Sequence, residues 1–262
     1  MTSDYLEFAH RLADAAGTAI MPHYRTRLVP EDKSAGGRFD PVTVADRAAE
    51  QVMRDLITQH YPSHGIIGEE FGSERVDAEF VWVLDPVDGT KSFMCGIPLW
   101  GTLIGLLHRG RPFLGVSEQP FLRERFWGDG KEAFGSGPLG TRKLETRRPV
   151  TLPNAIVYAG STVVTVPALQ DRLLLLTNSV RMVRYGADCY DTAMLAEGHI
   201  DTIIQTGLDI YDIAATVPII EGAGGVVTGL DGGPAIHAST IVASGDPALH
   251  AAILPLLQPQ TP

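Results

Sequence analysis

The chain has 262 residues, of which 44% are hydrophobic and 20% are charged, and its formal net charge is −10 at pH 7. This length and composition are typical of a globular protein with a sizeable core. No basic stripe offers a binding surface for nucleic acid or for an anionic membrane, so we expect neither as a partner.

The first half of the chain predicts helices packed on an antiparallel sheet. Apolar residues recur at helical spacing over 6–20, where Pro22 should end the helix, and again over 43–61. Between these helices, residues 31–41 are polar and contain glycines, which predicts a loop. Short apolar runs separated by turn residues then predict strands at 80–84, 103–107, 113–116 and 125–127.

The second half predicts an α/β layer. Residues 135–148 mix glycine, proline and charges without periodicity, so we place a boundary there between two units, 1–145 and 146–262. Beyond this boundary strand and helix patterns alternate. The expected strands are 155–158, 182–185, 202–205 and 226–228, and the expected helices are 167–176, 189–197 and 212–222.

Cysteine usage and the N-terminus indicate a compartment. Cys95 and Cys189 stand far apart and outside any metal-ligand spacing, which favours a reducing environment over a disulfide framework. The first helical pattern carries acidic positions, unlike the basic start and apolar run of a signal peptide. The apolar stretches are too short to span a bilayer. We therefore expect a cytoplasmic protein.

The strongest chemical signal lies between Trp82 and Lys91. An apolar strand runs directly into Asp85, and Asp88 follows three residues later. Two carboxylates at the end of a buried strand repel each other and lose hydration, so a bound cation is their natural compensation. Mg²⁺ prefers hard oxygen ligands and is commonly held by a few carboxylates together with substrate phosphate oxygens. Gly89 and Thr90 then offer N–H groups and a hydroxyl to a phosphate if a helix begins there.

Two further acidic segments have structural alternatives. Gly68-Glu69-Glu70 could be a solvated turn or could project into a cleft, and we expect Glu70 to contribute only weakly beside Glu69. Asp212 opens a helical pattern in Tyr211-Asp212-Ile213-Ala214-Ala215 and could be a helix cap. Asp85 and Asp88 could also be turn residues, but the whole string 85–90 matches a specific motif, which favours function.

These three segments resemble the signatures of the inositol monophosphatase superfamily in sequence, order and spacing. The resemblance covers nearly the whole chain, including residues 41–46 and 221–225. It implies a layered αβαβα sandwich, α/β or α+β in class, of the inositol monophosphatase and fructose-1,6-bisphosphatase type. It also implies a small phosphorylated substrate, dependence on Mg²⁺ with two or three ions per site, and frequent assembly into homodimers.

The resemblance further implies a set of metal ligands. Glu69, Asp85 and the Val87 carbonyl would hold one Mg²⁺, and Asp85, Asp88 and Asp212 would hold a second. Unit 1–145 would then carry most of the ligands, and unit 146–262 would carry the last ligand and the substrate pocket. A bound Mg²⁺ together with Glu69 would position and acidify a water for in-line attack on phosphorus.

Other residues acquire supporting roles by the same resemblance. Thr90 would help to activate the water and Asp46 would orient Thr90, although Thr43 and Asp46 could equally cap the helix that follows them. The Gly89 and Thr90 N–H groups would cradle the phosphate. Lys91 is better explained as a solvated surface lysine, because Mg²⁺ already neutralises the phosphate.

A finer resemblance concerns the substrate. Residues 186–190, 82–93 and 118–125 look most like histidinol-phosphate phosphatases of this superfamily. Asp188 near the substrate would pair with the ammonium of histidinol, with a helix cap as the structural alternative. Relatives commonly have Glu where this chain has Gln205, which can accept a hydrogen bond without charge assistance.

We therefore expect a phosphoric monoester hydrolase that releases L-histidinol from L-histidinol phosphate in histidine biosynthesis. The alternative is an inositol-1-monophosphatase or a broad-specificity small-molecule phosphatase. A non-catalytic binding module is disfavoured by the full set of expected ligands. A nucleotide-binding oxidoreductase is disfavoured because residues 222–225 follow a helix and precede a strand, which is the reverse of the required order.

Overall fold

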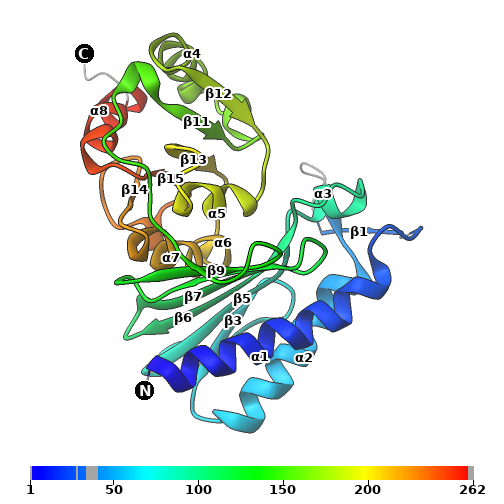
Figure 1. The fold of residues 1–262 in the computed structure, drawn as a ribbon. Coiled ribbons are helices and arrows are strands. Elements are labelled where there is room, and N and C mark those ends of the chain that lie inside the picture. The colour runs from blue at the N-terminus through cyan, green and yellow to red at the C-terminus, as the bar shows by residue number, and fades with distance from the viewer. Residues whose placement is uncertain (1, 28, 34–40, 259–262) are drawn as a thin grey trace.

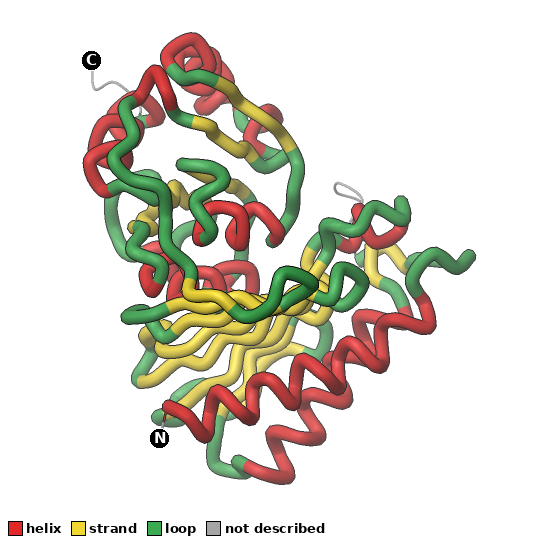
Figure 2. Tube along the Cα trace, in the orientation of Figure 1, coloured by secondary structure: helices red, strands yellow, loops and turns green. Residues whose placement is uncertain are grey.

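The computed structural model describes residues 2–27, 29–33 and 41–258. Helices and two β-sheets alternate through the molecule in five layers, with a pair of helices at one end and another at the other (Figures 1 and 2). This is the layered α/β arrangement that the sequence predicts. No helix in this described part of the chain is long and apolar enough to cross a membrane.

The first sheet has eight strands in the order β10-β9-β8-β7-β6-β5-β3-β4. All neighbouring pairs are antiparallel except β3 and β5. Its strands are β3 (Gly65–Gly68), β4 (Gly72–Glu74), β5 (Phe80–Asp88), β6 (Gly101–His108), β7 (Arg111–Gln119), β8 (Glu124–Gly128), β9 (Ala133–Ser136) and β10 (Arg142–Lys143).

Helices α1 (Thr2–Ile20) and α2 (Val44–His60) cover one face of this sheet (Figure 1). The apolar positions that predicted α1 are its inner face, where Leu12 and Ala16 are fully buried against Trp82 and neighbouring sheet residues. As expected, α1 ends before Pro22, and a short 3₁₀ turn (Met21–His23) follows. The packing of α1 and α2 therefore holds β5 in place from one face of the sheet.

The second sheet has five strands in the order β12-β11-β13-β15-β14. Strands β12, β11 and β13 are parallel, whereas β15 is antiparallel to both of its neighbours. The strands are β11 (Ile156–Ala159), β12 (Met182–Tyr185), β13 (Thr202–Thr206), β14 (Val226–Gly229) and β15 (Thr240–Ser244). Helices α4 (Pro167–Ser179) and α8 (Pro247–Leu257) cover its outer face.

Three short helices fill the layer between the sheets: α5 (Tyr190–Ala196), α6 (Ile210–Ile213) and α7 (Thr216–Gly222). The single helix predicted over 212–222 is therefore wrong in one respect. Pro218 has no N–H to donate to the carbonyl of Ala214, so the helical hydrogen bonds are interrupted between α6 and α7. The break places Asp212 on a separate short helix beside β5.

Sequence patterns missed several short strands and one helix, near the predicted boundary, in the loops and towards the C-terminus. Strands β9 and β10 extend the first sheet into the stretch 135–148, and β15 and α8 complete the second layer. In the predicted loop 31–41, β1 (Glu31–Asp32) pairs with β2 (Pro41–Val42), while 34–40 lie outside the described residues. The first sheet ends at Lys143 and the second begins at Ile156, and we propose the division at 145 on that ground.

Candidate active site and metal centre

Two carboxylates of strand β5 face the same pocket because the pairing of β5 with β6 is irregular. Residues three apart on a regular strand point to opposite faces. Between Asp85 and Asp88, however, the pairing of β5 with β6 shifts register, as at a β-bulge. The Thr102 hydroxyl holds this segment by donating to the Pro86 carbonyl at 2.8 Å. Both acids consequently line one pocket.

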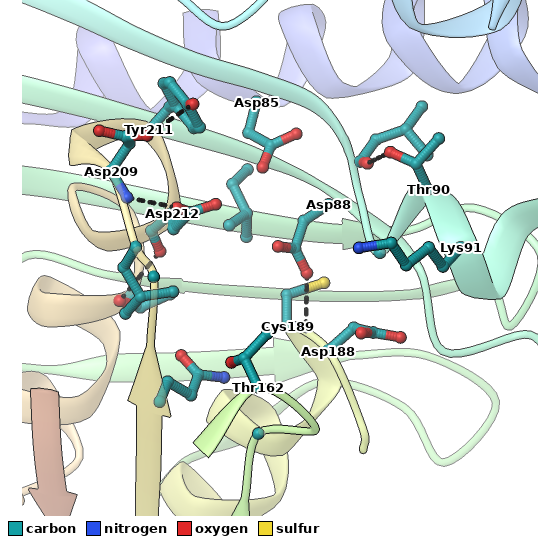
Figure 3. A pocket seen from close by; sticks show the side chains of 18 of the residues that line it. Asp85, Asp88, Thr90, Lys91, Thr162, Asp188, Cys189, Asp209, Tyr211 and Asp212 are labelled. Carbon is teal, nitrogen blue, oxygen red and sulfur yellow. Dashed lines mark hydrogen bonds between the residues drawn. The ribbon is translucent and has the colours of Figure 1, made fainter. Parts of the chain in front are cut away.

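A third carboxylate reaches the same point from α6. Oxygens of Asp85, Asp88 and Asp212 all lie within 4.8 Å of one another, and their side chains converge in Figure 3. Asp212 is held by the Asp209 N–H, which donates to Asp212 Oδ2 at 2.7 Å in the first turn of α6. The N-cap of α6 is Asp209 and not Asp212, which is the third residue of the capping box and also lines the pocket.

The electrostatics of this group favour a cation. Burial, followed by the charges of Glu69, Asp88 and Asp212, raises the pKa of Asp85 well above its usual value. Burial and the charge of Asp188 raise the pKa of Asp88 to about 7, and burial and Asp88 raise the pKa of Asp212 to about 8. Three acids that resist simultaneous ionisation become compatible when a divalent cation lies between them.

One atom tests directly whether the residues fit a metal ion. Asp85 is 2% exposed, and its Oδ1 is fully buried without a hydrogen-bond partner among the described residues. An unpaired buried carboxylate oxygen is costly, and metal coordination is one of the few interactions that satisfies it. The donor set consists of hard oxygens, which suits Mg²⁺. The chain therefore fits the cation that its sequence suggests.

Glu69 lies beside this group without belonging to the cluster of three. Its N–H donates to the Leu84 carbonyl at 3.2 Å, which places it next to the end of β5. Lys33 Nζ lies 2.7 Å from Glu69 Oε1 and 2.9 Å from Glu70 Oε1. Glu69 lines the pocket, whereas burial raises the pKa of Glu70 to about 7 and its side chain is 2% exposed.

The turn that carries Glu69 is anchored by a residue that the sequence analysis did not single out. Glu50 on α2 is fully buried, and it accepts hydrogen bonds from the Glu70 N–H at 2.7 Å and the Phe71 N–H at 3.0 Å. Arg54 Nε donates to Glu50 at 2.8 Å. Gly68 permits this approach, because a Cβ there would lie 2.0 Å from Glu50 Oε1. The only sequence signal is that Glu50 and Arg54 lie four residues apart on a helix.

Thr90, Val87 and Asp46 form a hydrogen-bonded chain at the start of α3 (Thr90–Met94). The Thr90 hydroxyl lies 3.1 Å from the Val87 carbonyl and 3.5 Å from Asp46 Oδ1. Asp46 Oδ2 also accepts from the Thr43 N–H at 2.9 Å in the capping box of α2. Asp46 therefore takes part in the cap of α2, and the same carboxylate contacts Thr90.

Gly89 and Asp188 meet where the two halves of the chain come together. Gly89 has φ +82°, and a Cβ on it would lie 2.9 Å from Asp188 Cβ. Asp188 accepts a hydrogen bond from the Ser92 hydroxyl, and the neighbouring Cys189 N–H donates to Asp88 Oδ2 at 2.6 Å (Figure 3). The helix-cap alternative for Asp188 is wrong, because α5 has no side-chain cap.

Gln205 lines the opposite part of the pocket from β13, and its Nε2 donates to Asp191 at 3.0 and 3.1 Å. Lys91 is exposed, as expected, yet it also lines the rim. Sequence reasoning did not single out Asp191, Thr162 or Asp209. The pocket has a volume of about 420 Å³ and is lined by Glu69, Asp85, Val87, Asp88, Gly89, Thr90, Asp188, Gln205, Asp212 and residues from both sheets.

Comparison with known proteins agrees with this geometry. The chain matches the profile of the inositol monophosphatase family over residues 1–261. It is 39% identical to the chloroplastic bifunctional phosphatase IMPL2 of Arabidopsis thaliana over 94% of this chain and 73% of that protein. It is 34% identical to the histidinol-phosphatase of Mycobacterium tuberculosis over 93% of this chain and 94% of that one.

A solved structure of an inositol monophosphatase from Zymomonas mobilis superposes with a TM-score of 0.86 at 36% identity, covering 97% of this chain and 98% of that chain. The chain therefore belongs to the inositol monophosphatase family, whose members are Mg²⁺-dependent phosphatases that act on small phosphorylated molecules. The αβαβα architecture and the phosphoric monoester hydrolase class expected from the sequence are confirmed.

Proposed function

We propose that this protein hydrolyses L-histidinol phosphate to L-histidinol and phosphate in histidine biosynthesis. The observation that carries the proposal is the position of Asp188, which lines the pocket beside the three-carboxylate group. Its partner is the Ser92 hydroxyl, and no lysine or arginine of the described part of the chain forms an ion pair with it. Burial raises the pKa of Asp188, and the Ser92 hydroxyl and the charge of Lys91 offset this only in part. A half-buried acid without an ion-pair partner suits a substrate that carries an ammonium group.

The proposal includes a catalytic role for each residue that lines the pocket near the three carboxylates. Asp85, Asp88 and Asp212 would hold Mg²⁺ through carboxylate oxygens, and by family resemblance Glu69 and the Val87 carbonyl would complete a site for two or three ions. Bound Mg²⁺ supplies an acidified water and neutralises the phosphate charge. The chain's own contributions are to orient that water through Thr90, which Asp46 positions, and to bind phosphate oxygens through the Gly89 and Thr90 N–H groups.

The relatives support this substrate without deciding it. The similar Mycobacterium tuberculosis protein is a histidinol-phosphatase, whereas the similar Zymomonas mobilis structure is an inositol monophosphatase. The neutral side chain of Gln205 favours the second possibility, because an uncharged polyol needs no anionic partner. Myo-inositol 1-phosphate is therefore the second candidate substrate.

Side-by-side turnover distinguishes the two candidates. We would measure phosphate release from L-histidinol phosphate and from myo-inositol 1-phosphate, each with Mg²⁺ and with EDTA. We expect Mg²⁺-dependent turnover with kcat/KM at least about tenfold higher for L-histidinol phosphate, the value of one charge-assisted hydrogen bond. The reverse preference would overturn the substrate assignment and leave the phosphatase class in place.

A pair of substitutions separates substrate recognition from metal binding. Asp188→Asn should raise KM for L-histidinol phosphate by about tenfold while leaving turnover of p-nitrophenyl phosphate nearly unchanged, because that compound has no ammonium group. Asp88→Asn should abolish turnover of both substrates. Equal losses with both substrates in Asp188→Asn would show that Asp188 does not contact the ammonium.

A further inference from the structure

The pair formed by Asp191 and Gln205 is not explained by metal binding. Asp191 lies on α5, is 1% exposed and forms no ion pair with any cation among the described residues. Its two carboxylate oxygens accept hydrogen bonds from one donor, the Gln205 amide nitrogen, at 3.1 and 3.0 Å. A buried acid without an ion-pair partner lowers the stability of the fold. Because Asp191 contacts the pocket-lining Gln205, a role in the pocket would explain this cost.

Asp191 determines which end of the Gln205 amide faces the pocket. In the observed orientation the NH₂ group satisfies both carboxylate oxygens. Rotating the amide by half a turn would bring its carbonyl oxygen against two acceptors, which loses two hydrogen bonds and adds repulsion. Gln205 Oε1 accepts no hydrogen bond from the described residues and is not among their fully buried unpaired atoms. The acceptor end of the amide is therefore the end left free at the pocket.

The carboxylate also changes the character of that acceptor. A hydrogen bond from an amide NH₂ to a carboxylate polarises the amide and increases the negative charge on its carbonyl oxygen. Burial and the charge of Asp88 raise the pKa of Asp191 well above its usual value, and the hydrogen bond from Gln205 favours the charged form. Gln205 thus offers a formally neutral acceptor, which is strengthened when Asp191 is ionised. A hydrogen-bond donor of the substrate, such as an ammonium or a hydroxyl, suits this acceptor.

We propose that Asp191 is a positioning residue for substrate specificity, which holds Gln205 so that its carbonyl oxygen accepts a hydrogen bond from the substrate. The inference rests on the proposed phosphatase function and adds a specificity residue to the same pocket. Gln205 contacts the substrate, and Asp191 acts only through Gln205. The sequence predicts that Gln205 binds the substrate, and we infer that this binding depends on Asp191.

The test compares Asp191→Asn with the double variant Asp191→Asn, Gln205→Glu. In Asp191→Asn, the new amide can pair with either end of Gln205, so the orientation is no longer fixed. We expect KM for L-histidinol phosphate to rise about tenfold with kcat within about twofold. The double variant places a carboxylate at position 205 and a donor at 191, which restores both the charge and the hydrogen bond. Its KM should return to within about threefold of the parent value.

Controls separate positioning from a general structural role. Turnover of p-nitrophenyl phosphate, which has no donor for Gln205, should be the same in the parent and in Asp191→Asn. If Asp191 were only structural, Asp191→Asn would lower turnover of every substrate alike and Gln205→Glu would not rescue it, which overturns the proposal. If Asp191→Asn alone does not fold, the double variant tests the proposal by itself. A tenfold higher KM in the folded double variant would show that exchanging the amide and the carboxylate between positions 191 and 205 does not preserve substrate binding, which contradicts the proposal.

The same experiment distinguishes failure of this inference from failure of the proposed substrate. A parent enzyme that does not hydrolyse L-histidinol phosphate but does hydrolyse myo-inositol 1-phosphate overturns the substrate assignment only. The rise in KM and its rescue are then measured with myo-inositol 1-phosphate, whose hydroxyls are also donors. Rescue with either substrate supports the positioning role, and unchanged KM in Asp191→Asn with both substrates refutes it.

Discussion

Asp88 illustrates how single residues in this pocket serve chemistry at a cost in stability. Its carboxylate lies within 4.8 Å of two others, and burial raises its pKa to about 7. The fold compensates only partly, through the Cys189 N–H at 2.6 Å. Replacing a charged residue of this kind by a neutral one usually stabilises the protein and inactivates it.

Replacing Asp88 by Asn should therefore have opposite effects on activity and stability. We expect phosphate release to fall by at least about 1,000-fold, because a metal ligand is lost. Unfolding free energy without Mg²⁺ should be unchanged or about 1 kcal/mol higher, because repulsion is relieved while the amide oxygen still accepts from Cys189. Urea denaturation followed by circular dichroism measures the second effect, and an unfolded spectrum would contradict the prediction.

Glu69 and Glu70 should differ although they are neighbours and share Lys33. Glu69 lines the pocket beside Asp85, whereas Glu70 does not. We expect Glu69→Gln to lower kcat by at least about 100-fold, and Glu70→Gln, which can still accept from Lys33, by less than about fivefold. Steady-state phosphate release measures both, and equal losses would contradict the assignment.

The string 85–90 could be recognised from sequence because its residues act as one local unit on a strand end. Asp191 and Glu50 could not, because an acid within a helical pattern is usually solvated. Their roles depend on Gln205 and on the Glu70 and Phe71 N–H groups, which are 14, 20 and 21 residues away along the chain. Only the packing of α2 and α5 brings those partners together.

At the scale of elements, α2 supports the catalytic turn through the Glu50–Arg54 pair. Glu50→Gln should lower the unfolding free energy by about 3 kcal/mol, because the buried Arg54 loses its buried charged partner and keeps only the half-exposed Glu74. Asp55→Asn on the exposed side of α2, where Asp55 accepts from Gln51 at 2.9 Å, is the matched control and should change it by less than about 0.5 kcal/mol. Denaturant titration compares them, and similar values would show that the anchor contributes little.

Helix α8 adds a pH-sensitive contact to the second layer. His250 is 6% exposed, and Thr228 Oγ1 and Ser244 Oγ lie 3.0 and 3.3 Å from its ring nitrogens. Burial lowers the pKa of His250. Below the pKa of about 6.5 that a histidine has in the unfolded chain, His250 therefore binds a proton more readily in the unfolded than in the folded protein. The stability contributed by neutral His250 is present above that pH and is lost as the pH falls.

Comparison of variants isolates this contribution. The difference in unfolding free energy between the parent and His250→Gln should shrink by about 1 kcal/mol between pH 7.5 and pH 5. The control is His237→Gln, at an exposed histidine. Denaturant titrations at several pH values provide the measurement. A difference that grows as the pH falls would have the wrong sign and would refute the account.

Element types were easier to predict than element limits. The buried stripe of α1 has a helical period, and β5 is a compact apolar run, so both patterns are local. The break between α6 and α7 depends on one proline within an otherwise helical pattern. Strands β9 and β10 carry glycine and charge, and only the pairing of β9 with β8 and of β10 with β9 makes them strands. Such pairing is a property of the sheet and not of the segment.

At the scale of the whole molecule, the pocket joins parts of the chain that fold on different sheets. Asp85 and Asp88 come from the first sheet and Asp212 from the middle helical layer (Figures 1 and 3). Gln205 reaches the same pocket from the second sheet. A cation held by the three acids would therefore connect layers on both sides of the proposed division at 145. Assembly into a homodimer and a cytoplasmic location stay predictions from the resemblance and composition.

Mg²⁺ should stabilise the entire fold, because a ligand that binds only the native state shifts the unfolding equilibrium by mass action. At a concentration of about 100 times Kd the gain is about 2.7 kcal/mol, which raises Tm by about 5 to 10 °C for a chain of this size. EDTA should reverse the increase.

Two variants test whether the three-carboxylate group causes that increase. Asp212→Asn removes the ligand that comes from the middle layer, and its Tm should respond to Mg²⁺ by less than about 2 °C. Asp55→Asn removes one exposed acid from α2, away from the pocket, and should keep the full increase. Because both variants lose one negative charge, a difference between them reports coordination and not net charge. Equal increases in both would place the binding of Mg²⁺ elsewhere on this acidic protein.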